Sequence, residues 1–446
     1  MPKQKIKKIS LSQKTKPKTQ SSAKKTIHKP SIRTFNVHGS DSTQAWEFSH
    51  HLVPPMTAST TFRLKSLKRG ADGFQHFANP QNHEDPIWIY DRLEEPSSKM
   101  LEEQLAKMEC GEVAISFSSG MGAISASFLA FLKQGDHVLS HKTLYGCTYS
   151  LITSWLPRFG IDHTLVNVNQ ISAQDLKRKN LKVIYFESVA NPSLEIIDID
   201  RLVELVKSEN KNRREENHIK IVVDNTFATP WGLRPLEHGA DMVIQSLTKN
   251  IAGFGTEMGG AIITAKKNLT PILMIRKDIG AIMHPHSAWN IMIYGIPSQI
   301  LRFEAQQKNA LAIAQYLEKH PLVERVYYPG LASFPQYKLA KQVLKSPTGD
   351  FAPGTMLSFT LKGNNSKTEK FINHIAQNGY SITLAVSLGL IKTLIEVPGL
   401  MTHAAVPKDK QEESGIPAKL IRMSLGIETA EDIIADLNSA FKKIKP

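Results

Sequence analysis

The sequence predicts an α/β fold with a mainly parallel central sheet and a smaller α/β domain toward the C-terminus. Between residues 97 and 265, short apolar runs of strand length alternate with amphipathic runs of helix length. This alternation indicates right-handed crossovers and a sheet covered on both faces. From about residue 294, a long helical pattern precedes new strand-like runs, which indicates a second domain.

The predicted elements follow from local patterns. The strands are short and apolar, often β-branched, and we place them at residues 113–117, 137–140, 181–186, 219–223, 242–245 and 259–264. The helices carry apolar residues at helical spacing, and we place them at residues 97–108, from a turn at 118–122 up to 132, at 147–157 and at 199–208. In the smaller domain we expect a helix at 305–317 and a strand at 356–361.

Composition divides the chain into four parts. Residues 1–30 are rich in Lys, Ser, Thr and Gln and nearly lack large apolar side chains, so we expect a disordered basic tail. Residues 31–95 are rich in Pro, His, Asn and aromatic residues with poor periodicity, which is typical of an extended arm lying across another surface. Residues 96–293 and 294–446 are the two expected folded domains.

The tail also holds most of the positive charge. It has ten lysines and no Asp or Glu, so the net charge of +14 falls to +4 in the rest of the chain. Such a tail could attach to nucleic acid or to another anionic surface, or it could be a solvated segment that affects only solubility. The second interpretation is the simpler one, and we therefore do not expect a nucleic-acid partner.

The remaining composition is that of a globular protein, with 41% apolar and 22% charged residues. No apolar run approaches the roughly 18 residues that span a bilayer, and no apolar block follows the N-terminal lysines as it would in a secretory signal. The two cysteines, Cys110 and Cys147, are too few for a disulfide framework or a four-cysteine zinc site. We expect a cytoplasmic protein without a metal or a membrane partner.

An acid directly follows one of the predicted strands. Ile221, Val222 and Val223 run into Asp224, which places its carboxylate at the carboxyl end of a strand, where open α/β sheets bind their ligands. There it can pair with a cation of the ligand. Alternatively, Asp224 could cap a helix or close a turn, as aspartates after strands often do.

A lysine follows the next strand. Lys249 ends the run Ser246-Leu247-Thr248-Lys249, and a glycine-rich stretch comes after it. The two hydroxyls suit a phosphate. An amine near a phosphate and an acid suits pyridoxal phosphate (PLP), whose protonated ring nitrogen needs a carboxylate partner. Alone, Lys249 could be a solvated loop lysine; with Asp224 placed 25 residues earlier, the functional interpretation is favoured.

Two further turns also follow predicted strands. The run Ser118-Ser119-Gly120-Met121-Gly122 opens a helix, whose first backbone N–H groups form a ready phosphate site. The run Leu144-Tyr145-Gly146 puts Tyr145 at the same edge of the sheet, where its ring could stack on a flat cofactor. Each signal is weak by itself, because any nucleotide-binding fold could have the first turn and Tyr145 could be a half-buried core residue.

Taken together, these motifs resemble the Cys/Met-metabolism family of PLP enzymes. That family includes cystathionine γ-synthase, cystathionine γ-lyase, O-acetylhomoserine sulfhydrylase and methionine γ-lyase. The resemblance extends from Pro54 to Leu437, and besides the runs above it is carried by Ser59–Phe62, Tyr185–Ser188 with Asn191-Pro192, Val222–Thr226, Arg234–Leu236, Gly239–Asp241, Ser387–Gly389, Met401–His403 and Arg422–Gly426. It implies the type I fold of PLP-dependent transferases, which is the fold of aspartate aminotransferase.

The resemblance implies a role for each candidate residue. Lys249 is the lysine that holds PLP as a Schiff base, Asp224 pairs with the ring nitrogen, and Tyr145 stacks on the ring and is a candidate general acid. Other contacts to the cofactor come from Ser119, Gly120, Met121, Ser246, Thr248 and Asn191. Arg422, assisted by Ser387, holds the carboxylate of the substrate.

The resemblance also implies an active site shared between subunits. In this family a Tyr-x-Arg pair, here Tyr90 and Arg92, reaches the phosphate in the neighbouring subunit, so we expect a homodimer or homotetramer. The sequence departs from the family nearby. Glu95 stands where the family usually has Asn, which would alter the packing of this loop, and the segment from Phe62 to Tyr90 is longer than usual.

Two positions bear on the substrate. Cys147 and Val386 resemble the residues of methionine γ-lyase, whereas relatives that handle cystathionine tend to have Glu in place of Val386. An apolar Val386 suits an uncharged thioether, although Cys147 could equally be a small core residue. We therefore expect γ-elimination from L-methionine. The alternatives are γ-replacement on an activated homoserine, cystathionine γ-lyase activity, and a PLP-bound scaffold without catalysis, which the presence of all four reactive residues disfavours.

Overall fold

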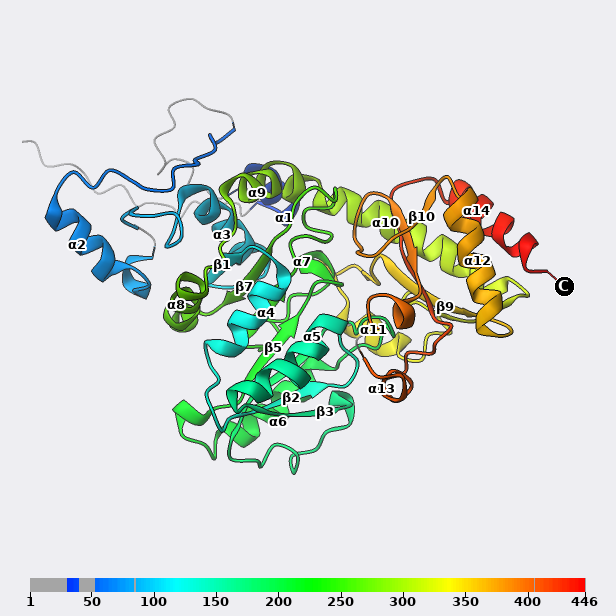
Figure 1. Ribbon diagram of the computed structural model, residues 1–446, viewed down its shortest axis with the longest axis horizontal. Helices are drawn as coiled ribbons and strands as arrows, with labels where there is room; N and C mark the ends of the chain where they lie inside the picture. The colour runs from blue at the N-terminus through cyan, green and yellow to red at the C-terminus, as the bar shows by residue number, and fades with distance from the viewer. Residues whose placement is uncertain (1–29, 40–52, 84–85, 405, 446) are drawn as a thin grey trace, which may run out of the picture. The chain divides into compact units, whose positions relative to one another are not determined.

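The computed structural model describes residues 30–39, 53–83, 86–404 and 406–445. The predicted disordered tail therefore lies outside the described residues, except for Pro30. The chain from Ile32 onward is one compact unit. It contains two sheets, each with its own helices (Figure 1), so the predicted α/β class with a smaller second sheet is confirmed.

The larger sheet has seven strands in the order β1-β7-β6-β5-β4-β2-β3. Strands β6, β5, β4, β2 and β3 run parallel, and β7 lies antiparallel between β1 and β6, which confirms a mainly parallel sheet. The strands are β1 (Val113–Phe117), β2 (His137–His141), β3 (Asp162–Val166), β4 (Leu181–Glu187), β5 (Lys220–Asp224), β6 (Met242–Gln245) and β7 (Gly260–Thr264). Only β3 was not predicted, because this edge strand is partly exposed and has no apolar run.

The side chains of the larger sheet alternate between two buried layers. In β5, Val222 packs in a layer with α4 (Gly120–Leu129) and α8 (Leu269–Ile279). Its neighbours Ile221 and Val223 pack in the opposite layer with α6 (Ile199–Asn210). Both faces are therefore covered, which is why the strands read as continuous apolar runs instead of alternating ones.

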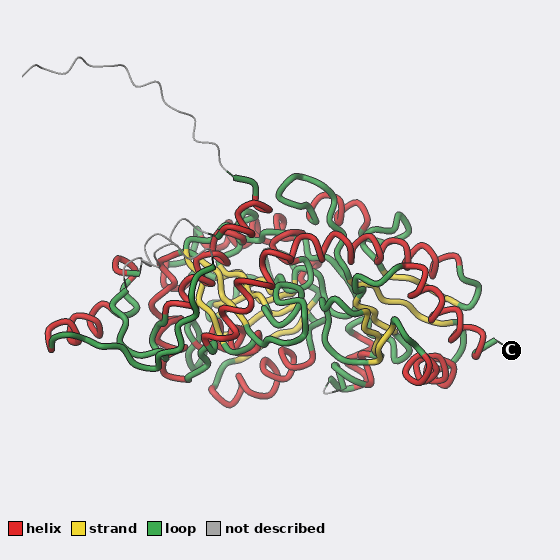
Figure 2. Tube along the Cα trace, turned by 90° about the horizontal axis from the view of Figure 1, so that it is seen from above, coloured by secondary structure: helices red, strands yellow, loops and turns green. Residues whose placement is uncertain are grey.

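The smaller sheet has five strands in the order β10-β11-β12-β9-β8, and all neighbours are antiparallel except β10 and β11. Its strands are β8 (Val323–Tyr327), β9 (Met356–Leu361), β10 (Ile382–Leu384), β11 (Thr393–Glu396) and β12 (Ile421–Ser424). Helices α10 (Ile296–Lys319), α12 (Asn365–Asn378) and α14 (Ala430–Lys443) share one buried layer with it. Figure 2 shows the two groups of strands, each flanked by helices.

Helix α10 starts nine residues before the predicted 305–317. Its first turns bury Gln299 and Arg302, and these polar residues interrupt the apolar pattern in the sequence. The guanidinium of Arg302 donates to the backbone oxygens of Asn250 (2.7 Å) and Ile251 (3.0 Å). The start of this helix is thus held by polar contacts that hydrophobic periodicity does not reveal.

Two of the remaining α-helices lie in the predicted arm. The remaining α-helices are α1 (Ile32–His38), α2 (Leu67–His76), α3 (Pro96–Met108), α5 (Gly146–Ser150), α7 (Thr229–Gly232), α9 (Pro285–Asn290), α11 (Tyr337–Val343) and α13 (Lys408–Glu413). The arm is thus not extended throughout, since it contains α1 and α2 (Figure 1). That residues 31–95 cross to another chain stays a prediction.

Glu95, the departure from the family pattern, caps helix α3. Its carboxylate accepts the backbone N–H groups of Ser97 (2.7 Å) and Ser98, and the hydroxyl of Thr57 donates to it at 3.0 Å. A negative charge at a helix N-terminus also interacts favourably with the helix dipole. This one side chain therefore ties the segment around Thr57 to the start of α3.

Candidate active site

A cavity of about 620 Å³ lies at the carboxyl ends of the parallel strands. Strands β4, β5 and β6 end there, and the smaller sheet contributes residues of β12 and of the loop after β10. Most of the predicted site residues line it, namely Ser119, Gly120, Met121, Tyr145, Asn191, Asp224, Ser246, Thr248, Lys249, Val386, Ser387 and Arg422. Residues at the ends of β1, β2, β4, β5 and β6, or just after them, are thus brought to one place. Open α/β sheets bind their ligands at this edge.

One end of the cavity presents hydrogen-bond donors suited to a phosphate. Helix α4 begins there, and the Ser119 hydroxyl caps it by accepting the Gly122 N–H at 3.1 Å. A Cβ at Gly120 would lie 2.9 Å from the side chain of Ser246, so only glycine lets the helix start approach this hydroxyl. Backbone N–H groups, the helix dipole and two hydroxyls (Ser246 and Thr248) together fit a phosphate dianion.

The floor of the cavity carries the predicted acid. Asp224 Oδ1 accepts the Thr226 N–H at 3.0 Å, and the Tyr185 hydroxyl donates to Oδ2 at 3.3 Å. Burial raises the pKa of Asp224. A cationic group of a ligand would reverse this shift, because an opposite charge favours the ionised carboxylate. The position therefore fits a protonated ring nitrogen.

The predicted lysine faces the same cavity. Lys249 Nζ donates to Ser387 Oγ at 2.9 Å. Burial, and next the positive charge of Arg422, lower the pKa of Lys249 to about 8. The amine is therefore more often neutral near physiological pH than an exposed lysine, and a neutral amine can attack a carbonyl. Phosphate donors, an acid and this amine in one cavity fit PLP.

Arg422 on β12 forms the opposite wall. Its Nη1 donates to Asn191 Oδ1 at 3.0 Å, and its Nη2 donates to the Ser387 backbone oxygen at 2.8 Å. Nη2 also pairs with Glu396 at 3.0 Å, and both side chains of this ion pair are buried. The Nε of Arg422 has no partner among the described residues. Arg422 is thus held by three partners at the wall of the cavity, where a guanidinium suits a carboxylate.

Tyr145 lies directly before α5 and lines the cavity. Its backbone N–H donates to Glu187 Oε1 at 2.6 Å. The thiol of Cys147 donates to its hydroxyl at 3.3 Å, so Cys147 touches the site through Tyr145 without lining the cavity. Burial raises the pKa of Tyr145, which keeps this hydroxyl protonated.

Besides Cys147, two predicted residues, Tyr90 and Arg92, do not line this cavity. Arg92 Nη1 donates to the Lys277 backbone oxygen at 3.1 Å, and its guanidinium lies 5.4 Å from the centre of the Tyr90 ring. Neither Tyr90 nor Arg92 lines the cavity of its own chain. That Tyr90 and Arg92 contact a bound phosphate stays a prediction.

The sequence-based prediction missed several residues of the site. Glu187 and Thr402 line the cavity, and Glu396 lies behind Arg422. The signal for Glu187 was present, because it ends an apolar strand just as Asp224 does. Glu396 also ends a strand, β11, but nothing in the local pattern shows that this strand lies beside β12.

The structure also bears on ligands of other kinds. Among the described residues, no three His, Cys, Asp or Glu side chains gather as a metal site would require. No helix in the described part of the chain is long and apolar enough to cross a membrane. Cys110 and Cys147 are both free thiols. A cytoplasmic location stays a prediction.

Comparisons with known proteins agree with this geometry. The family model described as "Cys/Met metabolism PLP-dependent enzyme" matches residues 33–442. The chain is 41% identical over 396 residues to an L-methionine γ-lyase of Fusobacterium nucleatum subsp. polymorphum, covering 88% of this chain and 94% of that protein. It is 36% identical over 370 residues to a cystathionine γ-lyase of Bacillus subtilis strain 168, covering 82% and 92%.

A solved structure shows the same fold. The cystathionine γ-lyase of Lactobacillus plantarum, complexed with L-serine, superposes with a TM-score of 0.80 at 31% identity, covering 93% of this chain and 99% of that one. The match thus extends over both sheets and the cavity between them. On the fold, the family model and the sequence identity together, the chain belongs to the Cys/Met metabolism family of PLP-dependent enzymes.

Proposed function

We propose that this enzyme removes the γ-substituent of an amino acid whose side chain is an uncharged thioether. The proposed substrate is L-methionine, which with water gives 2-oxobutanoate, ammonia and methanethiol. PLP, the cofactor of the family, supplies an electron sink for carbanion chemistry when it is bound. The names of the similar relatives, which include L-methionine γ-lyase, support this choice of reaction.

The positions of the site residues support a division of roles. Lys249 would hold the cofactor covalently, Asp224 would face its ring nitrogen, and Tyr145 would lie against its ring. The start of α4, with Ser119, Gly120, Met121, Ser246 and Thr248, would hold the phosphate. These eight residues fit the four roles because the cavity gathers them with the required chemistry.

Three side chains would act on the substrate itself. Arg422, with Ser387 and Asn191, binds the α-carboxylate through its planar guanidinium. Lys249, whose pKa burial lowers to about 8, accepts the Cα proton and moves it away from Cα. The hydroxyl of Tyr145, which stays protonated, donates a proton to the departing sulfur.

The observation that carries the choice of a thioether is the lack of a spare charge on the cavity wall. Among the described residues, the charged side chains that line the cavity are Glu187, Asp224, Lys249 and Arg422. Glu187 is held by the backbone N–H of Tyr145, and the other three have the roles proposed above. The rest of the wall is largely apolar and includes Phe227, Met258, Val386, Leu388 and Met401. The distal amino and carboxylate groups of cystathionine would have no charged partner there, whereas a methyl thioether would be well packed.

The proposal predicts release of 2-oxobutanoate from L-methionine by the purified holoenzyme. Cystathionine, and O-acetylhomoserine with sulfide, serve as parallel substrates under the same conditions. We expect methionine to have the highest kcat/KM of the three. Conversion of the homoserine ester to a thioether without turnover of methionine would contradict γ-elimination and make the enzyme a transferase of the same family.

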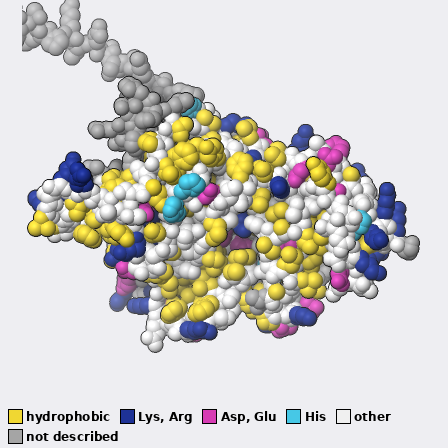
Figure 3. Space-filling view, turned by 45° about the horizontal axis from the view of Figure 1, so that its top comes forward, with side chains coloured by type: hydrophobic (Ala, Val, Ile, Leu, Met, Phe, Trp, Pro, Cys, Tyr) yellow, Lys and Arg dark blue, Asp and Glu magenta, His cyan; other side chains and the backbone are white. Residues whose placement is uncertain are grey.

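We also propose that the active enzyme is a homo-oligomer in which Tyr90 and Arg92 complete the phosphate site of another copy. Their position outside the cavity of their own chain supports this arrangement. Figure 3 shows hydrophobic side chains gathered on one face, and the exposed large hydrophobic residues include Phe254, Met258, Tyr294 and Leu301. Such exposed apolar surface is typical of association sites.

Subunit mixing tests the shared site. Arg92→Ala and Lys249→Ala each inactivate a homo-oligomer, because each removes one half of every site. In a mixed oligomer, one site combines an intact Lys249 with an intact Arg92, so we expect activity to return to about a quarter of wild type for random dimers. Activity that stays absent after subunit exchange has been verified by mass would rule out the sharing.

A further inference from the structure

Glu187 forms hydrogen bonds with two segments of the chain, and each segment contributes a residue to the proposed site. Its Oε1 accepts the backbone N–H of Tyr145 at 2.6 Å, and its Oε2 accepts the backbone N–H of Asn191 at 2.8 Å. The residue is only 6% exposed. Both oxygens of this buried carboxylate thus accept hydrogen bonds from backbone N–H groups. None of the roles proposed above is assigned to Glu187.

The contacts continue from Asn191 around the cavity. Asn191 Oδ1 accepts from Arg422 Nη1 at 3.0 Å, and Arg422 Nη2 pairs with Glu396 at 3.0 Å. The hydroxyl of Thr402 then donates to Glu396 Oε1 at 2.8 Å. Each link joins a different element, so the path runs from β4 through β12 and β11 to the loop that follows β11.

The path closes at Gly146, the residue after Tyr145. A Cβ at Gly146 would collide with the backbone oxygen of Thr402, so the loop that carries Thr402 touches the turn that carries Tyr145. Starting from Glu187, the polar contacts and this close approach form a closed ring around the cavity. In such a ring, moving one member shifts the Tyr145 turn relative to Arg422.

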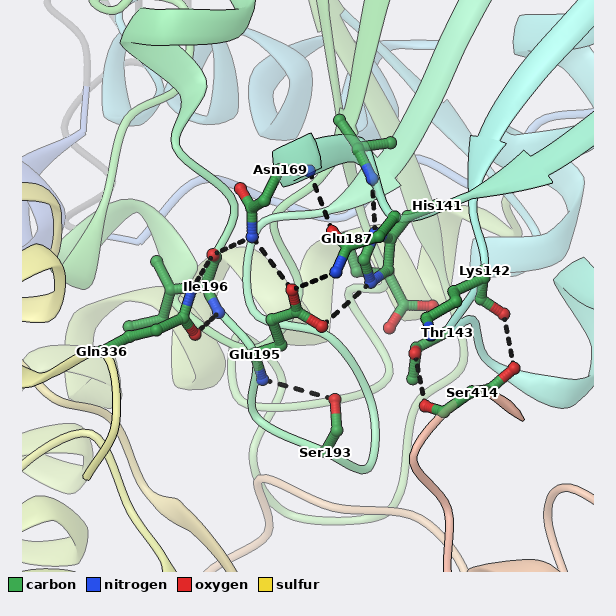
Figure 4. Close-up of polar contacts among 12 residues, drawn as sticks. His141, Lys142, Thr143, Asn169, Glu187, Ser193, Glu195, Ile196, Gln336 and Ser414 are labelled. Carbon is green, nitrogen blue, oxygen red and sulfur yellow. Dashed lines mark hydrogen bonds and ion pairs between the residues drawn. The ribbon is translucent and has the colours of Figure 1, made fainter. Parts of the chain in front are cut away.

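The chain before Tyr145 is fixed on its other side. Thr143 Oγ1 donates to the Ser414 backbone oxygen at 2.7 Å, and His141 Nδ1 accepts the Val168 N–H at 3.2 Å. The other ring nitrogen of His141 lies 3.5 Å from the carboxylate of Glu195. Figure 4 shows this anchored segment with Glu187 beside it. Since the chain before it is held, the bond to Glu187 decides where the Tyr145 turn begins.

We propose that Glu187 is a positioning residue that aligns the ring of Tyr145 with the guanidinium of Arg422. Its buried carboxylate fixes the position of Tyr145, which would face the cofactor, relative to that of Arg422, which would bind the substrate carboxylate. Catalysis depends on such alignment, because small displacements of reacting groups cost large factors in rate. This inference rests on the proposed site but not on the identity of the substrate.

The isosteric change Glu187→Gln tests the alignment without removing volume. An amide has one acceptor oxygen, so its NH2 group must face one of the two backbone N–H groups and that bond is lost. We expect the variant to bind the same amount of cofactor, with kcat lowered and KM raised, and with kcat/KM about tenfold lower or more. The visible circular dichroism of the bound cofactor should change as well, since the Tyr145 ring moves relative to it.

Glu109→Gln is the matched control. Glu109 is also buried and also accepts N–H bonds, from the side chains of Gln245 (2.5 Å) and Asn225 (3.2 Å), but it does not line the cavity. We expect this variant to keep the wild-type kcat, KM and dichroism. Because one oxygen of Glu109 accepts both bonds, an amide oxygen can replace it.

The outcome can be separated from that of the proposed function. Kinetics are measured with whichever substrate the wild-type enzyme converts, and the dichroism needs no substrate. The inference would be overturned if Glu187→Gln kept the wild-type kcat, KM and dichroism per bound cofactor. It would also be overturned if Glu109→Gln changed kcat, KM and dichroism as much as Glu187→Gln does. If Glu187→Gln does not fold, Glu187→Asp replaces it, because the shorter side chain cannot accept both N–H groups. This variant must then show the lowered kcat, the raised KM and the changed dichroism.

Discussion

The change Lys249→Ala is expected to lower kcat/KM by about 10⁴-fold or more, since it removes both the attachment of PLP and the base that takes the Cα proton. The holoenzyme should lose covalent attachment while keeping its fold, because Lys249 makes its side-chain hydrogen bond only to Ser387 among the described residues. Reduction with borohydride followed by peptide mass analysis measures the attachment. The wild-type protein should carry the reduced cofactor on the peptide that contains Lys249.

Lys267→Ala is the control for this experiment. Lys267 lies in the same region of the chain but is exposed to solvent, away from the cavity. This variant should keep both the reduced adduct and the activity. An adduct found on another lysine of the wild-type protein would overturn the assignment of Lys249.

The change Asp224→Asn is expected to lower kcat by about 10²- to 10³-fold while the protein still binds PLP. The amide keeps the size of the side chain and can still accept the Thr226 N–H, which Asp224 Oδ1 accepts at 3.0 Å. It cannot balance a positive charge on the ring nitrogen, so the cofactor becomes a weaker electron sink. Steady-state kinetics and the cofactor content of the purified variant measure the two parts of this prediction.

Asp241→Asn is a control of similar local structure. Asp241 also accepts a backbone N–H, that of Ile221 at 2.8 Å, and burial raises its pKa, but it does not line the cavity. We expect a modest loss of thermal stability and an unchanged kcat. A kcat in Asp224→Asn close to that of wild type would show that Asp224 does not stabilise the charge of the cofactor.

Residues that end apolar strands were the part of the site that could be predicted from sequence. Asp224 ends β5 and Ser246 directly follows β6, and the parallel arrangement of these strands brings their ends to one edge. Glu187 ends β4 in the same way and was missed, although the same rule applies to it. Helices α3, α4 and α6 were predicted to within a few residues, because their apolar faces pack on the sheet, whereas α7, α8 and α9 were not predicted.

Buried polar residues and a partly exposed edge strand could not be predicted from local patterns. The start of α10 buries Gln299 and Arg302, which read as surface residues in the sequence. The edge strand β3 was missed because it is partly exposed and its sequence lacks an apolar run. Gln299, Arg302 and strand β3 are all stabilised by partners elsewhere in the chain. Local periodicity carries no information about those partners.

The sequence by itself determined the α/β class and the order of the main elements of the larger sheet, because apolar periodicity is a local property. Strand-end chemistry indicated Asp224 and Lys249 as candidates, and the family resemblance implied the roles of Tyr145 and Arg422. Only the tertiary structure decided that Arg422 shares a buried pair with Glu396, that Glu187 joins Tyr145 to Asn191, and that Tyr90 and Arg92 lie outside their own cavity. The physical reason is that these contacts join residues from different elements, such as Tyr145 and Glu187, which are 42 residues apart, and Asn191 and Arg422, which are 231 residues apart. Their geometry is set by how the strands pair and how the loops between them fold, and no single segment encodes it.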